Sequence, residues 1–178
     1  LLNILQERAA QLGIHQTFQR EVTSVDEVAR DADLVILCDG INSRFRSQYA
    51  STFKPEIEVR SCKYMWLGTH RIFDAFTFIV VQNEFGVFQV HAYRFDANTS
   101  TFIVECDPDS WRAAGLDRAT TEQSVAFCEK MFAPWLQGER LLTNKSEWLN
   151  FRTIRNATWC HENMVLMGDA AHTAHFSI

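Results

Sequence analysis

The first forty residues carry a hydrophobic pattern that predicts a helix, a strand, a short helix and a buried strand. Apolar residues recur at helical spacing over residues 1–12, and Gly13 follows as a C-terminal stop. Residues 14–22 predict a short strand, and residues 24–30 predict a turn or short helix. Residues 33–38 form an apolar run without alternation, which predicts a strand buried on both faces, as in a parallel sheet.

The middle of the chain changes to short strands separated by turn-like segments. Strands are predicted over residues 63–72, 76–82, 87–95 and 101–105. The short polar connections between them are typical of antiparallel hairpins, so we expect a β-meander. After the meander, Thr120 and Gln123 predict a capping box at the start of a helix with an apolar stripe.

The last thirty residues predict a return to the first layer. Residues 150–156 predict a strand, and residues 164–167 predict a short buried strand before a new helix. We therefore expect an α/β (α+β) fold in which an α/β domain, residues 1–55 and 149–178, is interrupted by an antiparallel sheet over residues 56–148. Because helical patterns are running at both ends, N- and C-terminal parts of the α/β domain are expected to lie outside these residues.

Composition and charge exclude several classes of partner. The net charge of the 178 residues is −5, and no basic block is present, so neither nucleic acid nor an anionic membrane surface is expected as a partner. No apolar run approaches the roughly 20 residues that span a bilayer. Five scattered cysteines without a C-x-x-C pair favour reduced thiols and a cytoplasmic location.

The first candidate motif directly follows the buried strand at residues 33–38. Gly40 permits a tight turn, and Asp39 is expected at the carboxyl end of the strand, where open α/β sheets bind ligands. Ser43 and Arg46 can begin a helix and offer a hydroxyl group and a cation to a phosphate. A capped strand–turn–helix corner without a ligand is the alternative interpretation.

The second candidate motif follows the buried strand at residues 164–167. Gly168 allows close approach of a cofactor, and Asp169 can accept hydrogen bonds from a ligand hydroxyl. Ala170 is small, so the start of the next helix can press against a large ligand. An ordinary helix start with Asp169 as N-cap is the alternative.

Together, the two motifs resemble those of the flavoprotein aromatic hydroxylases typified by p-hydroxybenzoate hydroxylase. The resemblance extends over essentially the whole chain. It implies that Asp169 bonds the sugar-alcohol part of FAD, that residues 39–46 serve FAD and NAD(P)H, and that the sheet covers an aromatic substrate. Residues 1–55 and 149–178 would then be parts of the FAD-binding domain. The implied reaction is hydroxylation of an aromatic ring with O₂, without a protein nucleophile.

Further segments indicate a subgroup of that family. Residues 66–70, 73–78, 91–95 and 172–178 resemble the monooxygenases that act on aromatic acyl-CoA thioesters, such as those of salicylate and 2-aminobenzoate. The His-Phe-Ser-Ile ending also resembles tryptophan-hydroxylating flavoproteins. Two departures stand out. The family places proline where this chain has His175 and Phe176, and no G-x-G-x-x-G pyrophosphate loop is present.

The predicted sheet supplies the candidate substrate residues. Gln89, His91 and Tyr93 share one strand face by their period of two, and His91 is the candidate base for a phenol. The alternative is that His91 is a satisfied, partly exposed sheet residue and Tyr93 packs in the core. His172 and His175 are spaced i, i+3, but nothing nearby completes a ligand set, so no metal site is expected.

Three functional hypotheses remain open from the sequence. The first is a flavin monooxygenase acting on an aromatic small molecule, possibly a CoA thioester. The second is a flavoprotein with other chemistry, such as indole or tryptophan hydroxylation. The third is a module that is inactive as isolated, because the pyrophosphate loop is missing from these residues. The sequence leaves the oligomeric state open.

Overall fold

The computed structural model describes residues 1–175, and the chain divides into two compact units. Unit 1 comprises Leu1–Pro55 and Ala157–Ala171, and unit 2 comprises Glu56–Asn156 with the segment that begins at His172. Residues 149–156 were expected to belong to the α/β domain, but the structure groups them with the sheet because β7 (Leu149–Asn156) pairs with β2 (Pro55–Thr69).

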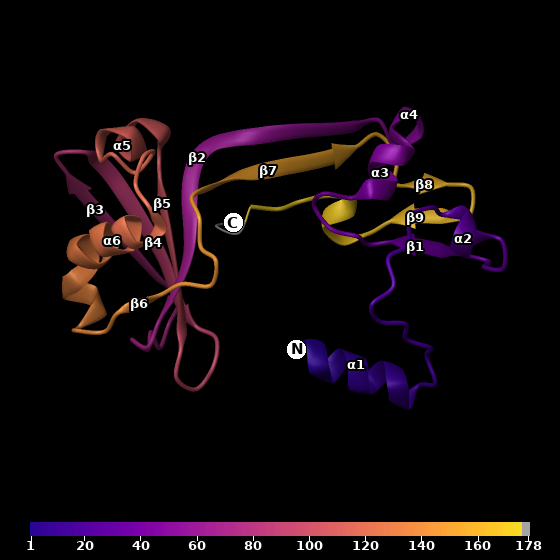
Figure 1. The fold of residues 1–178 in the computed structure, drawn as a ribbon, viewed down its shortest axis with the longest axis horizontal. Helices are drawn as coiled ribbons and strands as arrows, with labels where there is room; N and C mark the ends of the chain where they lie inside the picture. Colours follow the sequence, from indigo (N-terminus) through magenta and orange to yellow (C-terminus); the bar gives the residue numbers. More distant parts are fainter. Residues whose placement is uncertain (176–178) are drawn as a thin grey trace. The chain divides into compact units, whose positions relative to one another are not determined.

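Unit 1 combines short helices with a three-stranded sheet (Figure 1). The elements are α1 (Leu2–Gln11), α2 (Asp26–Ala29), β1 (Val35–Leu37), α3 (Arg44–Gln48), α4 (Ala50–Phe53), β8 (Cys160–His161), β9 (Met164–Leu166) and a 3-10 turn at Gly168–Ala170. The strand order is β1-β9-β8, and β1 runs parallel to β9. The expectation that the beginning and the end of the chain belong to one α/β layer is confirmed, because β1 pairs in parallel with β9.

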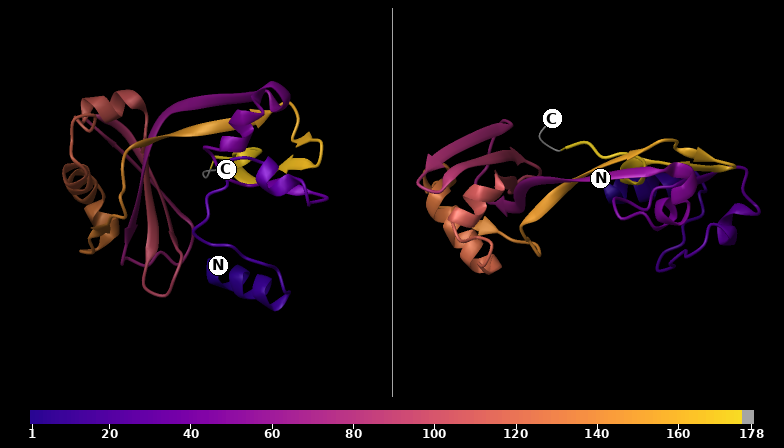
Figure 2. Two further views of the ribbon diagram at one scale, coloured as in Figure 1. Left: turned by 45° about the vertical axis from the view of Figure 1, so that its right-hand side comes forward. Right: turned by 90° about the horizontal axis from the view of Figure 1, so that it is seen from above.

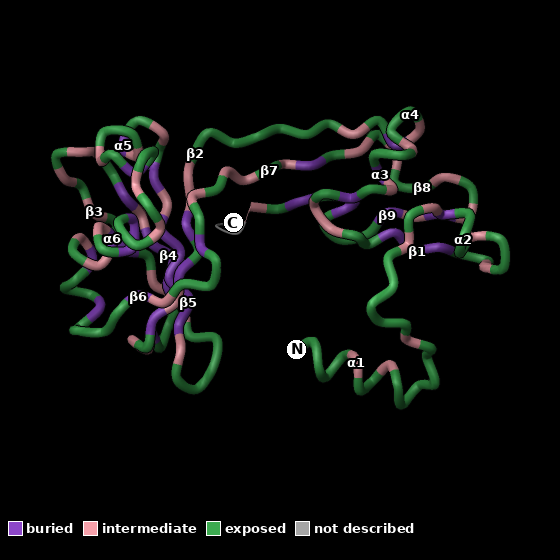
Figure 3. Tube along the Cα trace, in the orientation of Figure 1, coloured by how far each residue is buried: buried purple, intermediate pink, exposed green. Residues whose placement is uncertain are grey.

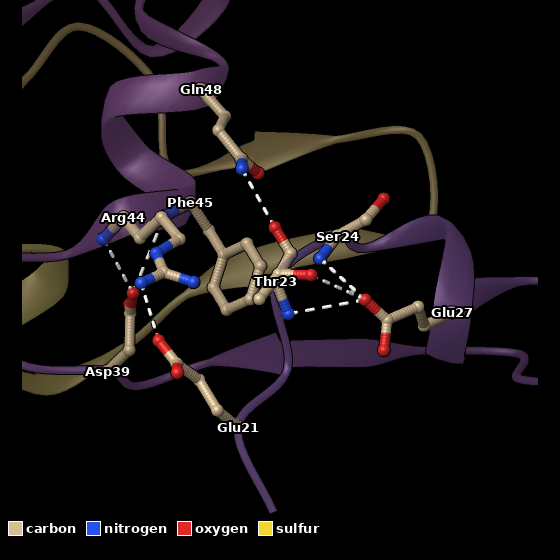
Figure 4. Close-up of polar contacts among 8 residues, drawn as sticks. All are labelled: Glu21, Thr23, Ser24, Glu27, Asp39, Arg44, Phe45 and Gln48. Carbon is tan, nitrogen blue, oxygen red and sulfur yellow. Dashed lines mark hydrogen bonds and ion pairs between the residues drawn. The ribbon is translucent and has the colours of Figure 1, made fainter.

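Two expectations for unit 1 are wrong. The strand β1 is not buried on both faces, because Ile36 is 47% exposed between the buried Val35 and Leu37. Residues 14–22 form no strand. Side chains fix the two residues that follow this segment. Gln48 donates to the Thr23 carbonyl at 2.9 Å, and Glu27 accepts hydrogen bonds from Thr23 and Ser24 (Figure 4).

Unit 2 is built on an antiparallel sheet with helices on one face (Figure 2). Its remaining elements are β3 (Thr77–Asn83), β4 (Gly86–Arg94), β5 (Ser100–Cys106), α5 (Pro108–Ala113), α6 (Thr121–Leu136) and β6 (Leu141–Leu142). The strand order is β3-β4-β5-β2-β6. The hairpins β3–β4 and β4–β5 are confirmed, but a simple meander is wrong, because β2 pairs with β5 and not with its sequence neighbour β3.

The core of unit 2 lies between the sheet and α6. Phe88, Val90 and Phe102 point into it from β4 and β5, and Cys128 and Phe132 meet them from the helix. The predicted capping box is confirmed: the Thr120 side chain accepts from the Gln123 amide, and the Gln123 side chain accepts from the Thr120 amide. Figure 3 shows the buried trace concentrated along β4 and β5, whereas α1 of unit 1 contains no buried residue.

A two-stranded extension of β2 and β7 completes unit 2. Asn150 ties the strands together, because its amide group donates to the carbonyls of Arg60, Ser61 and Cys62. The segment after unit 1 then lies along β7, where the Thr173 hydroxyl accepts from the Ile154 amide at 2.8 Å. Among residues 1–175, no helix is long and apolar enough to cross a membrane.

Candidate functional site

The two loop motifs are neighbours at one edge of the unit 1 sheet. Val35 lies opposite Met164 and Leu37 opposite Leu166 in a parallel register. The Met167 amide then donates to the Leu37 carbonyl at 2.9 Å, which continues the pairing to the end of both strands. Because the strands are parallel, the motifs that follow them begin side by side although 130 positions separate Asp39 from Asp169.

Arg46 joins the two motifs directly. Its side chain is 3% exposed, and the guanidinium group donates to the Ile41 carbonyl at 2.6 Å and to the Ala170 carbonyl at 3.1 Å. Burial lowers the pKa of Arg46, while the charge of Asp39 opposes that shift. From the sequence, this cation is expected to face a phosphate. The structure directs two of its nitrogens to backbone carbonyls of both loops, so its role in these contacts is to hold the loops together.

Asp39 and Ser43 cap the helix α3 from its amino end. The Asp39 carboxylate accepts from the Arg44 amide at 2.8 Å and from the Phe45 amide at 3.4 Å (Figure 4). The Ser43 hydroxyl is fully buried and accepts from the Arg46 amide at 2.9 Å. Gly40 adopts a φ of +84°, which confirms the predicted tight turn. The capped-corner interpretation therefore describes the local structure of this motif.

The second loop presents an exposed carboxylate. Gly168 has a φ of +61° and no heavy atom within 4 Å of the position that a Cβ would occupy. Asp169 is exposed, no hydrogen bond among residues 1–175 engages its carboxylate, and Ala170 behind it is fully buried. Asp169 lies inside the 3-10 turn and is not an N-cap, so that alternative is wrong for the described residues. A helix predicted to begin at the end of the chain lies outside them.

Gln89, His91 and Tyr93 share the sheet face that α6 does not cover. Their neighbours Phe88, Val90 and Ala92 are buried in the core on the other face, which confirms the predicted alternation. His91 is 1% exposed, because Phe78 packs against its ring with centroids 4.7 Å apart. Tyr93 stacks on Phe76 at 5.2 Å. The alternative that made His91 partly exposed is therefore wrong. The alternative that made Tyr93 a core residue is also wrong, because Tyr93 is half-buried and stacks on Phe76, which is 53% exposed.

Sequence reasoning missed two residues on this face, Glu105 and His175. Glu105 lies opposite Gln89 in the β4–β5 register, and its carboxylate lies 3.2 Å from His91 Nε2 and 3.7 Å from His175 Nε2. The Gln89 amide also lies 2.6 Å from His91 Nε2. The alternation along β5 held a signal for Glu105. Residue 105 shares a strand face with Ile103, and Ile103 lies opposite His91. Nothing in the local sequence connects residue 175 to this strand.

The electrostatics of this cluster favour neutral imidazoles beside a carboxyl group. Burial raises the pKa of Glu105. Desolvation lowers the pKa of His91, with a further contribution from His175, and desolvation followed by the charge of Arg60 lowers the pKa of His175. A neutral imidazole can accept a proton, so the arrangement provides a base next to an aromatic surface.

Two cavities adjoin the cluster within unit 2. The first measures about 350 Å³ and is lined by Gln89, Glu105 and His175, among others. The second measures about 470 Å³ and lies between β2, β7 and the segment after His172, with Arg60 and Arg155 in its wall. Both include Cys62 and His175, so they are adjacent. Within residues 1–175, no three His, Cys, Asp or Glu side chains gather in a way that would hold a metal ion.

The fold and the paired loops agree with the family to which this chain is related. The family model described as "FAD binding domain" matches residues 1–176. The chain therefore belongs to the FAD-binding-domain family. This membership supports the resemblance to flavoprotein hydroxylases that the motifs at residues 39–46 and 167–172 indicated.

Curated relatives refine the comparison. Salicyloyl-CoA 5-hydroxylase of Streptomyces sp. is 45% identical over the whole chain, which covers 36% of that protein. The 3-hydroxy-4-methyl-anthranilyl-[aryl-carrier protein] 5-monooxygenase of Streptosporangium sibiricum is 36% identical, again over the whole chain and 46% of that protein. Protodeoxyviolaceinate monooxygenase of Chromobacterium violaceum is 31% identical, with 48% of its length covered. The chain thus spans less than half of the length of each relative.

Solved structures confirm the fold. A 2-methyl-3-hydroxypyridine-5-carboxylic acid oxygenase matches 82% of this chain and 40% of its own with a TM-score of 0.60 at 18% identity. The p-nitrophenol 4-monooxygenase of Pseudomonas putida matches 80% of this chain and 35% of its own, also at 0.60, with 14% identity. At these identities the likeness concerns the architecture.

Proposed function

We propose that the protein is an FAD-dependent monooxygenase that hydroxylates an aromatic ring with NAD(P)H and O₂ in the cytoplasm. The observation that carries the proposal is the pairing of the two loop motifs at the ends of β1 and β9 in a chain of the FAD-binding-domain family. The five cysteines are free, which agrees with a reducing compartment. FAD, when bound, supplies the redox chemistry that activates oxygen.

The residues of unit 1 fit a cofactor of this kind. Asp169 offers an exposed carboxylate to a ligand hydroxyl, and the open space at Gly168 lets the ligand approach the backbone. Ala170 is fully buried behind that surface, and its small side chain leaves room for the ligand. On the first loop, Asp39, Gly40, Ser43 and Arg46 act mainly by shaping and anchoring the turn, since their polar atoms are engaged with amides and carbonyls.

The residues of unit 2 act on the ring. Gln89 and Tyr93 orient the substrate along the open sheet face, where Phe76 and Phe78 supply apolar surface and exclude water. His91, held neutral by its burial, accepts the proton of a ring hydroxyl by way of Glu105, which lines the cavity and lies 3.2 Å from His91 Nε2. The names of the two relatives with 45% and 36% identity refer to CoA-linked and carrier-protein-linked substrates, which favours an aromatic acyl thioester over a free acid or an indole.

The test is the flavin content of the protein expressed from its complete reading frame. We expect the absorption bands of oxidised flavin in the purified protein, and NAD(P)H oxidation that depends on an aromatic acyl-CoA and yields hydroxylated product. Asp169→Asn removes a charged acceptor, so its flavin affinity should fall about tenfold or more. Asp33→Asn, exposed before the amino end of β1, is the matched control and should retain flavin. A colourless protein that cannot be reconstituted with FAD would overturn the proposal.

A further inference from the structure

The cavity beside Gln89 has an acidic wall. Its charged lining residues are Glu105 from β5 and Asp107, which directly follows that strand. No lysine or arginine is among the residues that line it within residues 1–175. Hydrogen bonds from Ser110 lower the pKa of Asp107, which keeps this carboxylate ionised. His175, the imidazole in the wall, is held neutral by desolvation.

Two cations near this cavity, Lys63 and Arg60, donate to other partners. Lys63 lies opposite Cys106, but its ammonium group donates to Asn150 Oδ1 at 2.6 Å and lies 4.4 Å from the centre of the Trp111 ring. Arg60 belongs to the neighbouring cavity, where it donates to Glu58 at 2.9 Å and to Thr153 at 3.1 Å. A carboxylate bound against Gln89 would therefore face two carboxyl groups in a wall that contains no lysine or arginine from residues 1–175.

We propose that Glu105 is a specificity-determining residue that excludes aromatic acids with a free carboxylate and admits those whose acid is masked as a neutral thioester or amide. The inference rests on the proposed function, because it concerns the substrate of that same site. A partly buried anion needs a cation or several donors to replace its water, whereas a neutral carbonyl needs one donor. Like charges placed together across an interface oppose binding and set selectivity. Burial raises the pKa of Glu105, and the group supplies such a charge once the pH is above that value.

The test compares two probes with the same hydroxylated ring, salicylate and salicylamide, whose acid groups are charged and neutral at pH 7. Binding of each to the 178-residue chain is measured by NMR titration at pH 7, which is well above the ordinary carboxyl range. We expect salicylamide to bind about tenfold more tightly than salicylate. Glu105→Gln should reduce that ratio to about twofold by strengthening salicylate binding. Glu84→Gln, in the exposed β3–β4 turn, removes an equal charge elsewhere on the sheet and should leave the ratio unchanged.

A second variant covers the case in which Glu105→Gln fails to fold. Val87→Glu adds a carboxylate to the same wall from an exposed position of β4, so it should weaken salicylate binding further and change salicylamide binding little. Equal or tighter binding of salicylate by the unchanged chain would overturn the inference, as would a ratio that neither variant alters or a lack of saturable salicylamide binding. Flavin content and NAD(P)H oxidation are read independently, so failure of the proposed function remains distinguishable.

Discussion

The two units differ in what holds them together. Unit 2 closes a hydrophobic core of sixteen buried residues among those described, from Met65 to Leu141. The corresponding core of unit 1 has eight, and large apolar side chains such as Leu2, Ile4 and Phe18 are more than 60% exposed. Within the described residues, burial of apolar surface therefore contributes more to unit 2, and polar contacts such as those of Arg46 and Ser43 contribute a larger share in unit 1.

This contrast separates the two halves of the proposed chemistry. The side chains assigned to the substrate stand on β4 and β5, two paired strands whose other face is fixed in the core. The side chains assigned to the cofactor lie on turns that follow the short strands β1 and β9. Sites on paired strands are held more rigidly than sites on turns, so the substrate surface is preformed and the cofactor surface depends on a few hydrogen bonds.

The largest effect is expected from a truncation in the core of unit 2. Phe102 is fully buried, with ring centroids 6.2 Å from Phe73 and 5.6 Å from Phe132. Phe102→Ala removes these contacts and leaves a cavity, so it should lower the free energy of unfolding of unit 2 by about 3–5 kcal/mol. Urea denaturation followed by tryptophan fluorescence measures this change, because four of the five tryptophans lie in unit 2.

The matched control for that truncation is Phe95→Ala, because Phe95 is 61% exposed just after β4. Its effect should stay within about 0.5 kcal/mol. Hydrogen exchange at the Val35 amide of unit 1 should be unaffected by Phe102→Ala if the units are stabilised separately. Equal loss of protection at Val35 would break the comparison between the units.

A smaller but more local effect is expected at Arg46. Arg46→Met keeps much of the side-chain volume but removes the donors to Ile41 and Ala170, which should cost about 3 kcal/mol in unit 1. The readout is faster exchange of the Met167 amide, which bonds the Leu37 carbonyl. Arg44→Met is the control, since its ion pair with Glu21 is exposed and should matter little (Figure 4). Unchanged exchange in Arg46→Met would show that the loops hold without this residue.

Much of the fold could be predicted from local patterns, and the exceptions have physical causes. Period-two alternation identified β4 and the face shared by Gln89, His91 and Tyr93, and turn residues identified its hairpins. The predicted meander was wrong because the pairing of β2 with β5 depends on tertiary contacts and not on any nearby turn. The prediction of a strand over residues 14–22 was wrong because a strand requires a pairing partner, which the described residues do not supply.

The candidate site was predictable only where residues lie close in sequence. The motif positions Asp39 and Asp169 were identified one by one, but their connection through Arg46 spans 124 positions and leaves no local pattern. His175 likewise reaches Glu105 only because Thr173 anchors its segment along β7. Spacing therefore predicted which residues are candidates, whereas tertiary structure determined which of them meet.

The smallest effect concerns the acid dependence of α5. The Asp107 carboxylate accepts from the Ser110 hydroxyl, from the Ser110 amide at 3.0 Å and from the Asp109 amide at 2.8 Å. These hydrogen bonds hold the pKa of Asp107 below its ordinary value of 3.8. A carboxyl group whose pKa is lowered by folding contributes stability above its unfolded pKa and loses that contribution as the pH falls through its folded pKa. Asp107→Ala should therefore cost about 1 kcal/mol at pH 7, and the difference from the unchanged chain should shrink below about pH 4. Denaturation of both proteins across this range measures the difference in their free energies of unfolding. Asp107→Asn retains a cap that cannot ionise. The stability advantage of the unchanged chain over this variant should therefore also be larger at neutral pH than at low pH. A gap for Asp107→Ala that is independent of pH would mean that the cap acts through its neutral hydrogen bonds alone.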